Sequence, residues 1–194
     1  SQPLGIRVGT AINAVLSKEN LEEYDYILKV DAEIALPRNF VAENLREKPD
    51  FIASGGTAML FKVAPFLRVG GKYPETPELD DTHLSLQYLS QGYVVKRWVC
   101  PPEIRARAKG HHNFKHHVRV GIEWYKLGYE PIHVLFALQP LVQDIFKGKL
   151  RMELFLRVGS YFLAALRRTR RYKFAPWIFL MQVRRLIYGS QFQY

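Results

Sequence analysis

The sequence has a single cysteine, Cys100, among its 194 residues. One cysteine excludes an internal disulfide framework and is compatible with a reducing compartment. Long apolar runs are lacking too: the longest charge-free apolar stretch near the end of the chain is residues 131–143. That stretch is shorter than the roughly 20 residues of a bilayer-spanning helix. We therefore expect a cytoplasmic protein that crosses no membrane unassisted.

Acidic residues are scarce in the last quarter of the chain. Residues 147–194 carry 11 Lys and Arg against Glu153 alone, whereas residues 1–146 carry 17 residues of each sign. Such asymmetry predicts an anionic partner for residues 147–194, and basic amphipathic helices with aromatic residues suit an anionic membrane surface. The same apolar stripes could instead pack against the protein's own core. No recognised nucleic-acid motif is present, which argues against nucleic acid.

What is present is enough apolar sequence for a core, with 48% hydrophobic and 13% aromatic residues. Strand patterns alternate with helical patterns in the first part, which predicts an α/β sheet. From Asn113 onward the pattern is mostly helical. We expect an α/β domain over residues 1–130 and a basic amphipathic helical extension over residues 131–194. The expected strands are residues 26–30, 51–53, 57–62 and 93–99.

Two carboxylates follow the first apolar strand pattern, at Asp31 and Glu33. If the chain stays extended there, alternation sends both side chains to the same side of the sheet edge. Two oxygen donors at a strand end suit Mg²⁺ or Mn²⁺ bridging a diphosphate. Solvation or helix capping would explain the same acids without any ligand.

A second acidic pair, Asp80 and Asp81, stands where a helix is expected to begin. Capping is the ordinary reason for aspartate at such a position. The functional interpretation makes Asp81 a general base toward an acceptor hydroxyl and gives Asp80 the cap or a substrate contact. The helix that follows is expected to bury a stripe formed by Leu79, His83, Leu86 and Leu89.

Basic residues and histidines are concentrated between residues 105 and 117. Arg105 and Arg107 share one face if the segment is extended, and could stabilise a departing nucleoside diphosphate, although a solvated edge strand has the same pattern. His112 and His116 have the spacing of helical zinc sites, but Asn113 looks like a helix cap that would leave His112 outside the helix. We favour His111 or His112 as a phosphate or metal contact over a zinc hydrolase.

In order and spacing, these segments resemble an inverting family 2 glycosyltransferase of the GT-A type. The resemblance covers about residues 5–130. The segments that carry it are residues 5–13, 26–33 with Leu36, Pro37 and Phe40, Gly55-Gly56 before residues 59–62, and residues 80–84 before 92–94. It implies a GT-A-like mixed sheet flanked by helices. The N-terminal nucleotide-binding segment of that family is lacking in this sequence.

The resemblance also implies roles for individual residues. Asp31 and Glu33 correspond to the metal-binding DxD motif, and Asp81 to the catalytic aspartate. Glu33 and Asp80 are variants that keep a carboxylate where the family has Asp and Glu respectively. The further residues that the resemblance suggests are Asn13, Arg105, Arg107, His111 and His112 for the donor phosphates, and Gly55, Gly56 and Asp80 for the acceptor or substrate.

The function that the resemblance implies is metal-dependent transfer of one sugar, a hexosyl group, from a nucleotide-sugar to a glycan or lipid-linked acceptor hydroxyl. Processive synthases carry Gln-x-x-Arg-Trp in a region that reads His116-x-x-Arg119-Val120 here, which favours a non-processive enzyme. The alternative is a non-catalytic membrane-peripheral or nucleic-acid-binding module that uses the basic residues 147–194. A nucleotidyltransferase, which also pairs acids around a metal, is a weaker enzymatic alternative.

Overall fold

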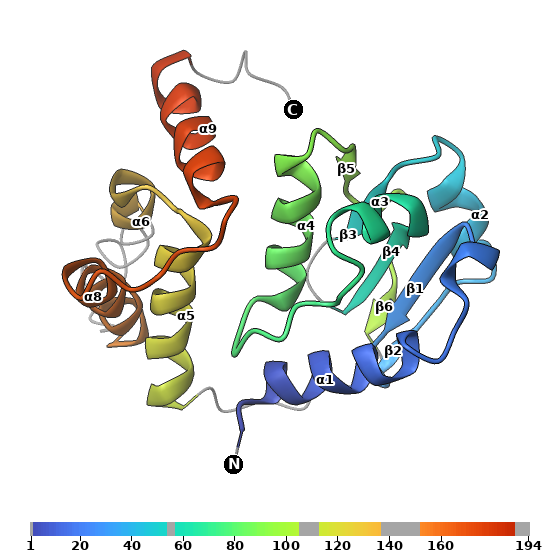
Figure 1. Cartoon of the computed structure of the whole chain (residues 1–194), viewed down its shortest axis with the longest axis horizontal. Coiled ribbons are helices and arrows are strands. Elements are labelled where there is room, and N and C mark those ends of the chain that lie inside the picture. The colour runs from blue at the N-terminus through green and yellow to red at the C-terminus, as the bar shows by residue number, and fades with distance from the viewer. Residues whose placement is uncertain (1, 54–56, 105–112, 137–151, 189–194) are drawn as a thin grey trace. The chain divides into compact units, whose positions relative to one another are not determined.

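The computed structural model describes residues 2–53, 57–104, 113–136 and 152–188. Contacts divide the chain into two compact units, residues 1–110 and residues 111–194 (Figure 1). The expected change from sheet domain to helical extension at residue 131 falls inside the second unit, because the helix Phe114–Leu127 packs along a helix from the basic C-terminal part.

The first unit is built on a four-stranded mixed sheet with the order β1-β4-β3-β5. Strand β1 pairs antiparallel with β4, in a register that joins Tyr26 to Lys62 and Val30 to Ala58. Strand β3 is antiparallel to β4 and parallel to β5. The strands are β1 (Tyr26–Val30), β3 (Phe51–Ala53), β4 (Ala58–Lys62) and β5 (Val95–Lys96).

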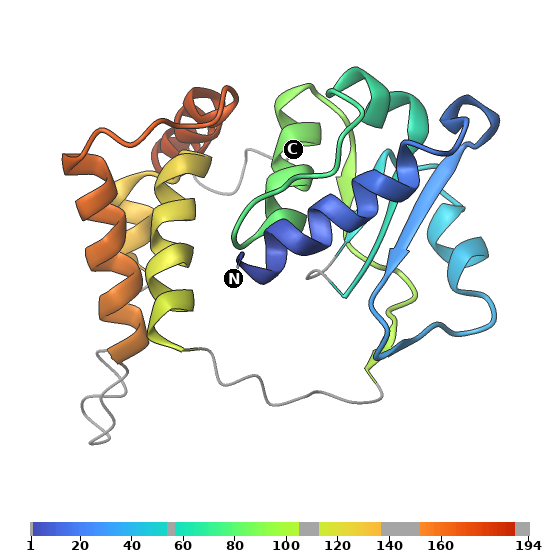
Figure 2. The same cartoon turned by 60° about the horizontal axis from the view of Figure 1, so that its bottom comes forward.

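Both faces of the central strands are buried, as their continuous apolar sequence requires. Met59 and Phe61 of β4 face a core that includes Leu84 and Tyr88. Leu60, which alternates with them, is buried on the other face. Figure 2 shows α1 and α4 on one side of the sheet and α2 on the other. The helices of this unit are α1 (Leu4–Leu16), α2 (Phe40–Leu45), α3 (Val63–Arg68) and α4 (Asp80–Ser90), and Leu21–Glu23 forms a short 3-10 turn.

A second, two-stranded sheet pairs β2 (Ile34–Ala35) with β6 (Glu103–Ile104) in antiparallel register. The pairing brings Ile34 opposite Ile104. It therefore ties the chain that follows β1 to the chain just before the basic segment that begins at residue 105.

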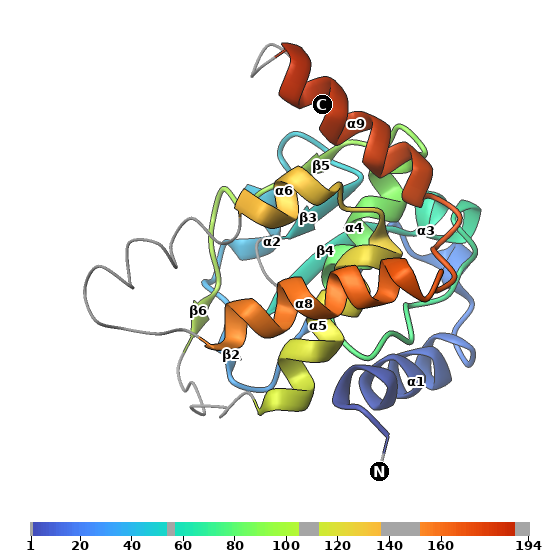
Figure 3. The ribbon, with the colours of Figure 1, turned by 90° about the vertical axis from the view of Figure 1, so that its left-hand side faces the viewer.

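The second unit is helical, with a core of its own around Tyr125, Val158 and Tyr161. Its helices α5 and α8 pack closely because Gly121 leaves no side chain between them: a Cβ there would lie 2.0 Å from the carbonyl oxygen of Arg157. Figure 3 shows α8 in front of α5. The described helices are α5 (Phe114–Leu127), α6 (Pro131–Phe136), α8 (Met152–Leu166) and α9 (Ala175–Tyr188).

Most of the expected elements are present, and the α/β class of the first part is confirmed. Asn113 is confirmed as a helix cap, since its side-chain oxygen accepts a hydrogen bond from the His116 backbone N–H at 3.0 Å. The expected buried stripe of α4 was wrong: the buried side chains are Leu84 and Tyr88. The helix begins after Leu79 and turns a different face to the sheet than the four-residue pattern suggested. The expected strand 93–99 is reduced to Val95–Lys96.

Candidate functional site

The acids that follow β1 lie in a turn. The backbone N–H of Asp31 donates to the carbonyl of Thr57 at 2.9 Å, which continues the pairing of β1 with β4, and the Ile34 N–H then donates to the Asp31 carbonyl at 3.1 Å. The extended-chain argument for Asp31 and Glu33 was therefore wrong, because strand alternation ends at Val30. Glu33 is exposed in this turn, and Asp31 is half-buried.

Lys29 is the nearest partner of Asp31. Its ammonium nitrogen lies 2.5 Å from Asp31 Oδ1, and only 13% of its side chain is exposed. The two residues lie two positions apart where β1 ends, and the Asp31 N–H still bonds to the Thr57 carbonyl, which keeps Asp31 beside the end of the strand. The sequence analysis did not select Lys29, although this spacing was a signal that could have found it.

Asp80 and Asp81 occupy the first turn of α4. The residue at the cap position is Leu79, whose backbone is left-handed with φ of 60°, a conformation that non-glycine residues seldom adopt. Neither aspartate acts as the N-cap of this helix. Asp80 instead accepts a hydrogen bond from the Tyr73 hydroxyl, with 2.5 Å between the oxygens. The two acids therefore do not cap the helix, although carboxylates in a first turn are stabilised by the helix dipole.

Electrostatic coupling links the end of β1 to the start of α4. The pKa of the Asp81 carboxyl is raised, mainly by burial and further by the negative charge of Asp80. A hydrogen bond from the Thr82 backbone N–H and the positive charge of Lys29 act in the opposite direction. Lys29 thus contacts Asp31 directly and acts on Asp81 as well.

The pKa of Tyr73 also indicates that these aspartates lie near one another. Burial is the main reason that the pKa of its hydroxyl is raised, and the negative charges of Asp80, Asp81 and Asp31 add to it. All three aspartates therefore lie within electrostatic reach of one phenol. We call Lys29, Asp31, Tyr73, Asp80 and Asp81 the carboxylate cluster.

One face of α1 packs against residues 73–76, the segment that contains Tyr73 and leads to Asp80 and Asp81. Gly5 and Gly9 lie one turn apart, and a Cβ at either would come within 2.4 to 2.5 Å of a backbone oxygen of residues 74–76. One turn further, the Asn13 side chain accepts from the Tyr73 N–H at 2.7 Å and donates to the Tyr73 carbonyl at 2.9 Å. The glycines allow the close approach, and Asn13 fixes the register.

Asn13 is therefore engaged in holding Tyr73, and its amide also donates to Glu75 at 2.9 Å. The resemblance gave Asn13 a role at the donor phosphates, and the described contacts are those of a residue that positions the cluster. Tyr73 itself carries no local sequence signal, because its partner Asp80 lies seven residues away along an irregular segment.

The other predicted site residues lie outside the described part of the chain. These are Gly55, Gly56, Arg105, Arg107, His111 and His112. Of the predicted residues that the structure describes, Asp31, Asp80 and Asp81 come together around Tyr73 and Lys29. Glu33 lies in the same turn as Asp31 but is exposed.

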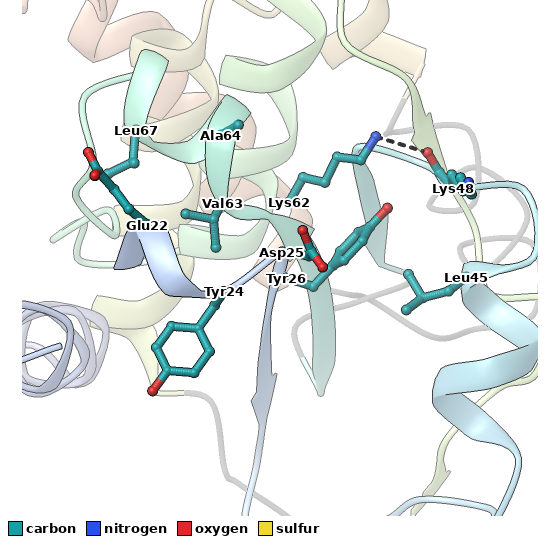
Figure 4. Close-up of a pocket in the computed structure, with 10 residues that line it drawn as sticks. All are labelled: Glu22, Tyr24, Asp25, Tyr26, Leu45, Lys48, Lys62, Val63, Ala64 and Leu67. Carbon is teal, nitrogen blue, oxygen red and sulfur yellow. Dashed lines mark hydrogen bonds between the residues drawn. The ribbon is translucent and has the colours of Figure 1, made fainter. Parts of the chain in front are cut away.

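A hollow of about 640 Å³ lies at the opposite end of β1 from Asp31, around Tyr24, Asp25 and Tyr26 (Figure 4). None of the predicted site residues lines it. Lys62 reaches across this region to the Lys48 carbonyl at 3.3 Å and to Asp50 at 3.0 Å, and the Tyr26 hydroxyl donates to the Pro49 carbonyl. Internal hydrogen bonds thus occupy the polar ends of Lys62 and Tyr26.

The donor set after β1 fits a divalent ion only in part. Within the described residues, no three or more His, Cys, Asp or Glu side chains are grouped so that they could hold a metal. Asp31 and Glu33 supply two carboxylates from one turn, and Mg²⁺ is commonly held by one or two carboxylates together with substrate phosphates. A site of that kind has too few protein ligands to form a group of three, and in this structure Asp31 Oδ1 is paired with the Lys29 ammonium group.

None of the described helices is long and apolar enough to cross a membrane. Comparison of the chain with models of known families, with curated proteins and with solved structures finds no match.

Proposed function

We propose that this protein is a metal-dependent inverting glycosyltransferase, which moves one sugar from a nucleotide-sugar to a hydroxyl acceptor. The observation that carries the proposal is the carboxylate cluster, in which Lys29 contacts an acid at the end of β1 and acts electrostatically on a half-buried acid at the start of α4. The resemblance stated for the sequence adds the reaction class, and a mixed sheet with a strand-end acid is the kind of scaffold that it implies.

Asp81 is the residue best suited to act as general base. Its raised pKa makes the carboxylate more basic than an exposed aspartate, which favours proton transfer from a hydroxyl near neutral pH. In the proposed reaction the acceptor oxygen bonds to the anomeric carbon as its proton passes to Asp81, and the bond from that carbon to the nucleoside diphosphate breaks. Attack on the face opposite the leaving group inverts the anomeric configuration.

Asp80 has a different role because Tyr73 holds it. A phenol whose pKa is raised stays protonated and keeps donating to the Asp80 carboxylate. Asp80 is thereby fixed in orientation, and its negative charge contributes to the raised pKa of Asp81. Tyr73 and Asp80 are positioning residues in this proposal.

Asp31 and Glu33 would hold Mg²⁺ or Mn²⁺, which supplies Lewis-acid stabilisation of the charge on the departing diphosphate. Lys29 keeps Asp31 oriented at the edge of β1 through the 2.5 Å contact. Arg105, Arg107 and either His111 or His112 would bind the phosphates, by their residue types and by the sequence resemblance.

The test measures nucleotide binding and transfer separately on the full chain. UDP and GDP are titrated with and without MnCl₂ by calorimetry, and release of nucleoside diphosphate is followed with a panel of nucleotide-sugars. Asp81→Asn should abolish transfer and leave binding of the nucleotide with Mn²⁺ intact. Asp25→Asn is the matched control, because Asp25 is an exposed aspartate at the other end of β1.

Three outcomes would overturn the proposal. Full turnover by Asp81→Asn would remove Asp81 as the base. Release of pyrophosphate would identify a nucleotidyltransferase. Absence of any response of the parent protein to nucleotides or Mn²⁺ would favour the non-catalytic module.

A further inference from the structure

Exposed apolar side chains are concentrated in the second unit. Of 20 large hydrophobic residues that are exposed in the described part of the chain, 12 lie at or after Phe114, although fewer residues are described there than in the first unit. A helical unit of this size has no need to leave so many apolar groups in water, and clustered exposed apolar groups mark interaction surfaces.

On α8 these residues form a stripe. Met152, Phe155, Leu163 and Leu166 are 43–81% exposed and follow each other at helical spacing, with Gly159 between them. The opposite face of the helix buries Val158, Tyr161 and Ala164 against α5 and the rest of the core. A Cβ at Gly159 would meet nothing within 4 Å, so the middle of the stripe is open as well.

Helix α9 repeats the arrangement. Trp177, Leu180 and Ile187 lie along one side and are 36–67% exposed, while Ile178 and Gln182 on the other side are buried. The inner side of α8 thus already has partners within the unit, as does that of α9 at Ile178 and Gln182, whereas Leu186 further along this side is 46% exposed. The apolar side chains of the outer stripes are exposed and do not belong to the core of the unit.

The charge around these stripes has one sign. Arg167, Arg168 and Arg170 are exposed at the end of α8 and in the connection to α9, and Arg184 and Arg185 are exposed on α9. Other arginines of the unit are used internally: Arg171 stacks on Tyr125, and Arg157 bonds His117 and lies over Trp124. Glu153 is the one acid in residues 147–194.

We infer that the outer stripes of α8 and α9, with these five arginines, form a docking surface for an anionic lipid bilayer. Apolar stripes flanked by arginine match a membrane interface, where the apolar groups enter the acyl boundary and the cations pair with lipid headgroups. A second copy of the chain would bring the same five cations together, which charge repulsion opposes. A nucleic acid would satisfy the arginines and leave the apolar stripes in water.

The experiment is flotation of the full chain with two kinds of vesicle, phosphatidylcholine alone and phosphatidylcholine mixed equally with phosphatidylglycerol. We expect binding to the anionic vesicles only, weakened by salt. Gly159→Glu puts an acid in the open middle of the α8 stripe without a steric clash, and should abolish flotation. Joint replacement of Arg184 and Arg185 by glutamine should weaken binding about fivefold for each arginine.

Two controls separate loss of binding from loss of fold. Gly159→Ala tests the same position without charge and should float like the parent. Val41→Glu places an acid at an exposed apolar helix position in the first unit and should also float normally. Circular dichroism checks that all variants keep their helix content.

The inference is overturned if the parent does not bind anionic vesicles, or if Gly159→Glu binds as well as the parent does. Self-association by light scattering or retention on RNA, without vesicle binding, would overturn it in favour of a second copy or a nucleic acid. The inference goes beyond the proposed enzyme activity, and its test does not depend on sugar transfer.

Discussion

Gly9 offers a sharp test of how α1 positions the carboxylate cluster. Replacing a helical glycine by alanine normally stabilises a protein by up to about 1 kcal/mol. At Gly9 the new Cβ would lie 2.5 Å from the Pro74 carbonyl oxygen and 3.0 Å from the Cα of Glu75. Backbone atoms must move to relieve this contact, and overpacking of that kind costs about 1–3 kcal/mol. We expect the clash to outweigh the gain in helix propensity.

The expected net loss for Gly9→Ala is about 1–2 kcal/mol, which lowers the melting temperature by roughly 2–8 °C. The same change at Gly159 of α8 is the matched control: nothing lies within 4 Å of its Cβ, so it should stabilise the second unit. Hydrogen exchange followed by mass spectrometry, read on peptides that cover residues 4–16 and 73–90, localises each effect. The reasoning fails if Gly9→Ala protects these peptides as much as Gly159→Ala protects α8.

Three further predictions concern the cluster itself. Asp81→Asn should stabilise the protein at neutral pH. The pKa of Asp81 is higher in the folded than in the unfolded protein, so the folded state loses stability as the pH rises between these two values. Urea unfolding at a series of pH values should show that the gain from Asp81→Asn vanishes below about pH 4. Lys29→Met removes a charge that lowers the Asp81 pKa, so the acidic limb of the pH profile of kcat/KM should move to higher pH, and an unmoved limb would contradict the coupling. Tyr73→Phe removes a hydrogen bond to a carboxylate and should lower the free energy of unfolding in urea by about 1.5–3 kcal/mol; an unchanged value would contradict the role given to this bond.

The strands that carry the site could be predicted because their apolar runs are short and bounded. The expected strands at residues 26–30 and 51–53 agree with β1 and β3, and Asp31 follows β1 while Asp80 and Asp81 begin α4, as expected. Helical spacing failed for α4. The apolar residues predicted a stripe that includes Leu86 and Leu89, whereas the helix buries Leu84 and Tyr88, which also lie four residues apart.

The parts that could not be predicted depend on contacts between distant segments. Asn13 holds Tyr73 across 60 residues, and the two glycines of α1 matter only because residues 74–76 pass over them. No local sequence pattern shows that another segment passes close to these glycines. A glycine within a helix usually only lowers the stability of that helix. Lys29 is the exception, because its position two residues before Asp31 was visible in the strand pattern.

The C-terminal helices are not a detachable appendage, and Glu130 shows why. This buried carboxylate accepts the backbone N–H groups of Ile132 and His133 at the start of α6, while its own N–H donates to Gln182 of α9 at 2.8 Å. Removing α9 would leave the Glu130 backbone N–H without its Gln182 acceptor and would remove the contacts that α9 makes with α5. Truncated chains would therefore combine loss of the basic helices with damage to the rest of the second unit. Single substitutions on the outer sides of these helices test their function without that damage.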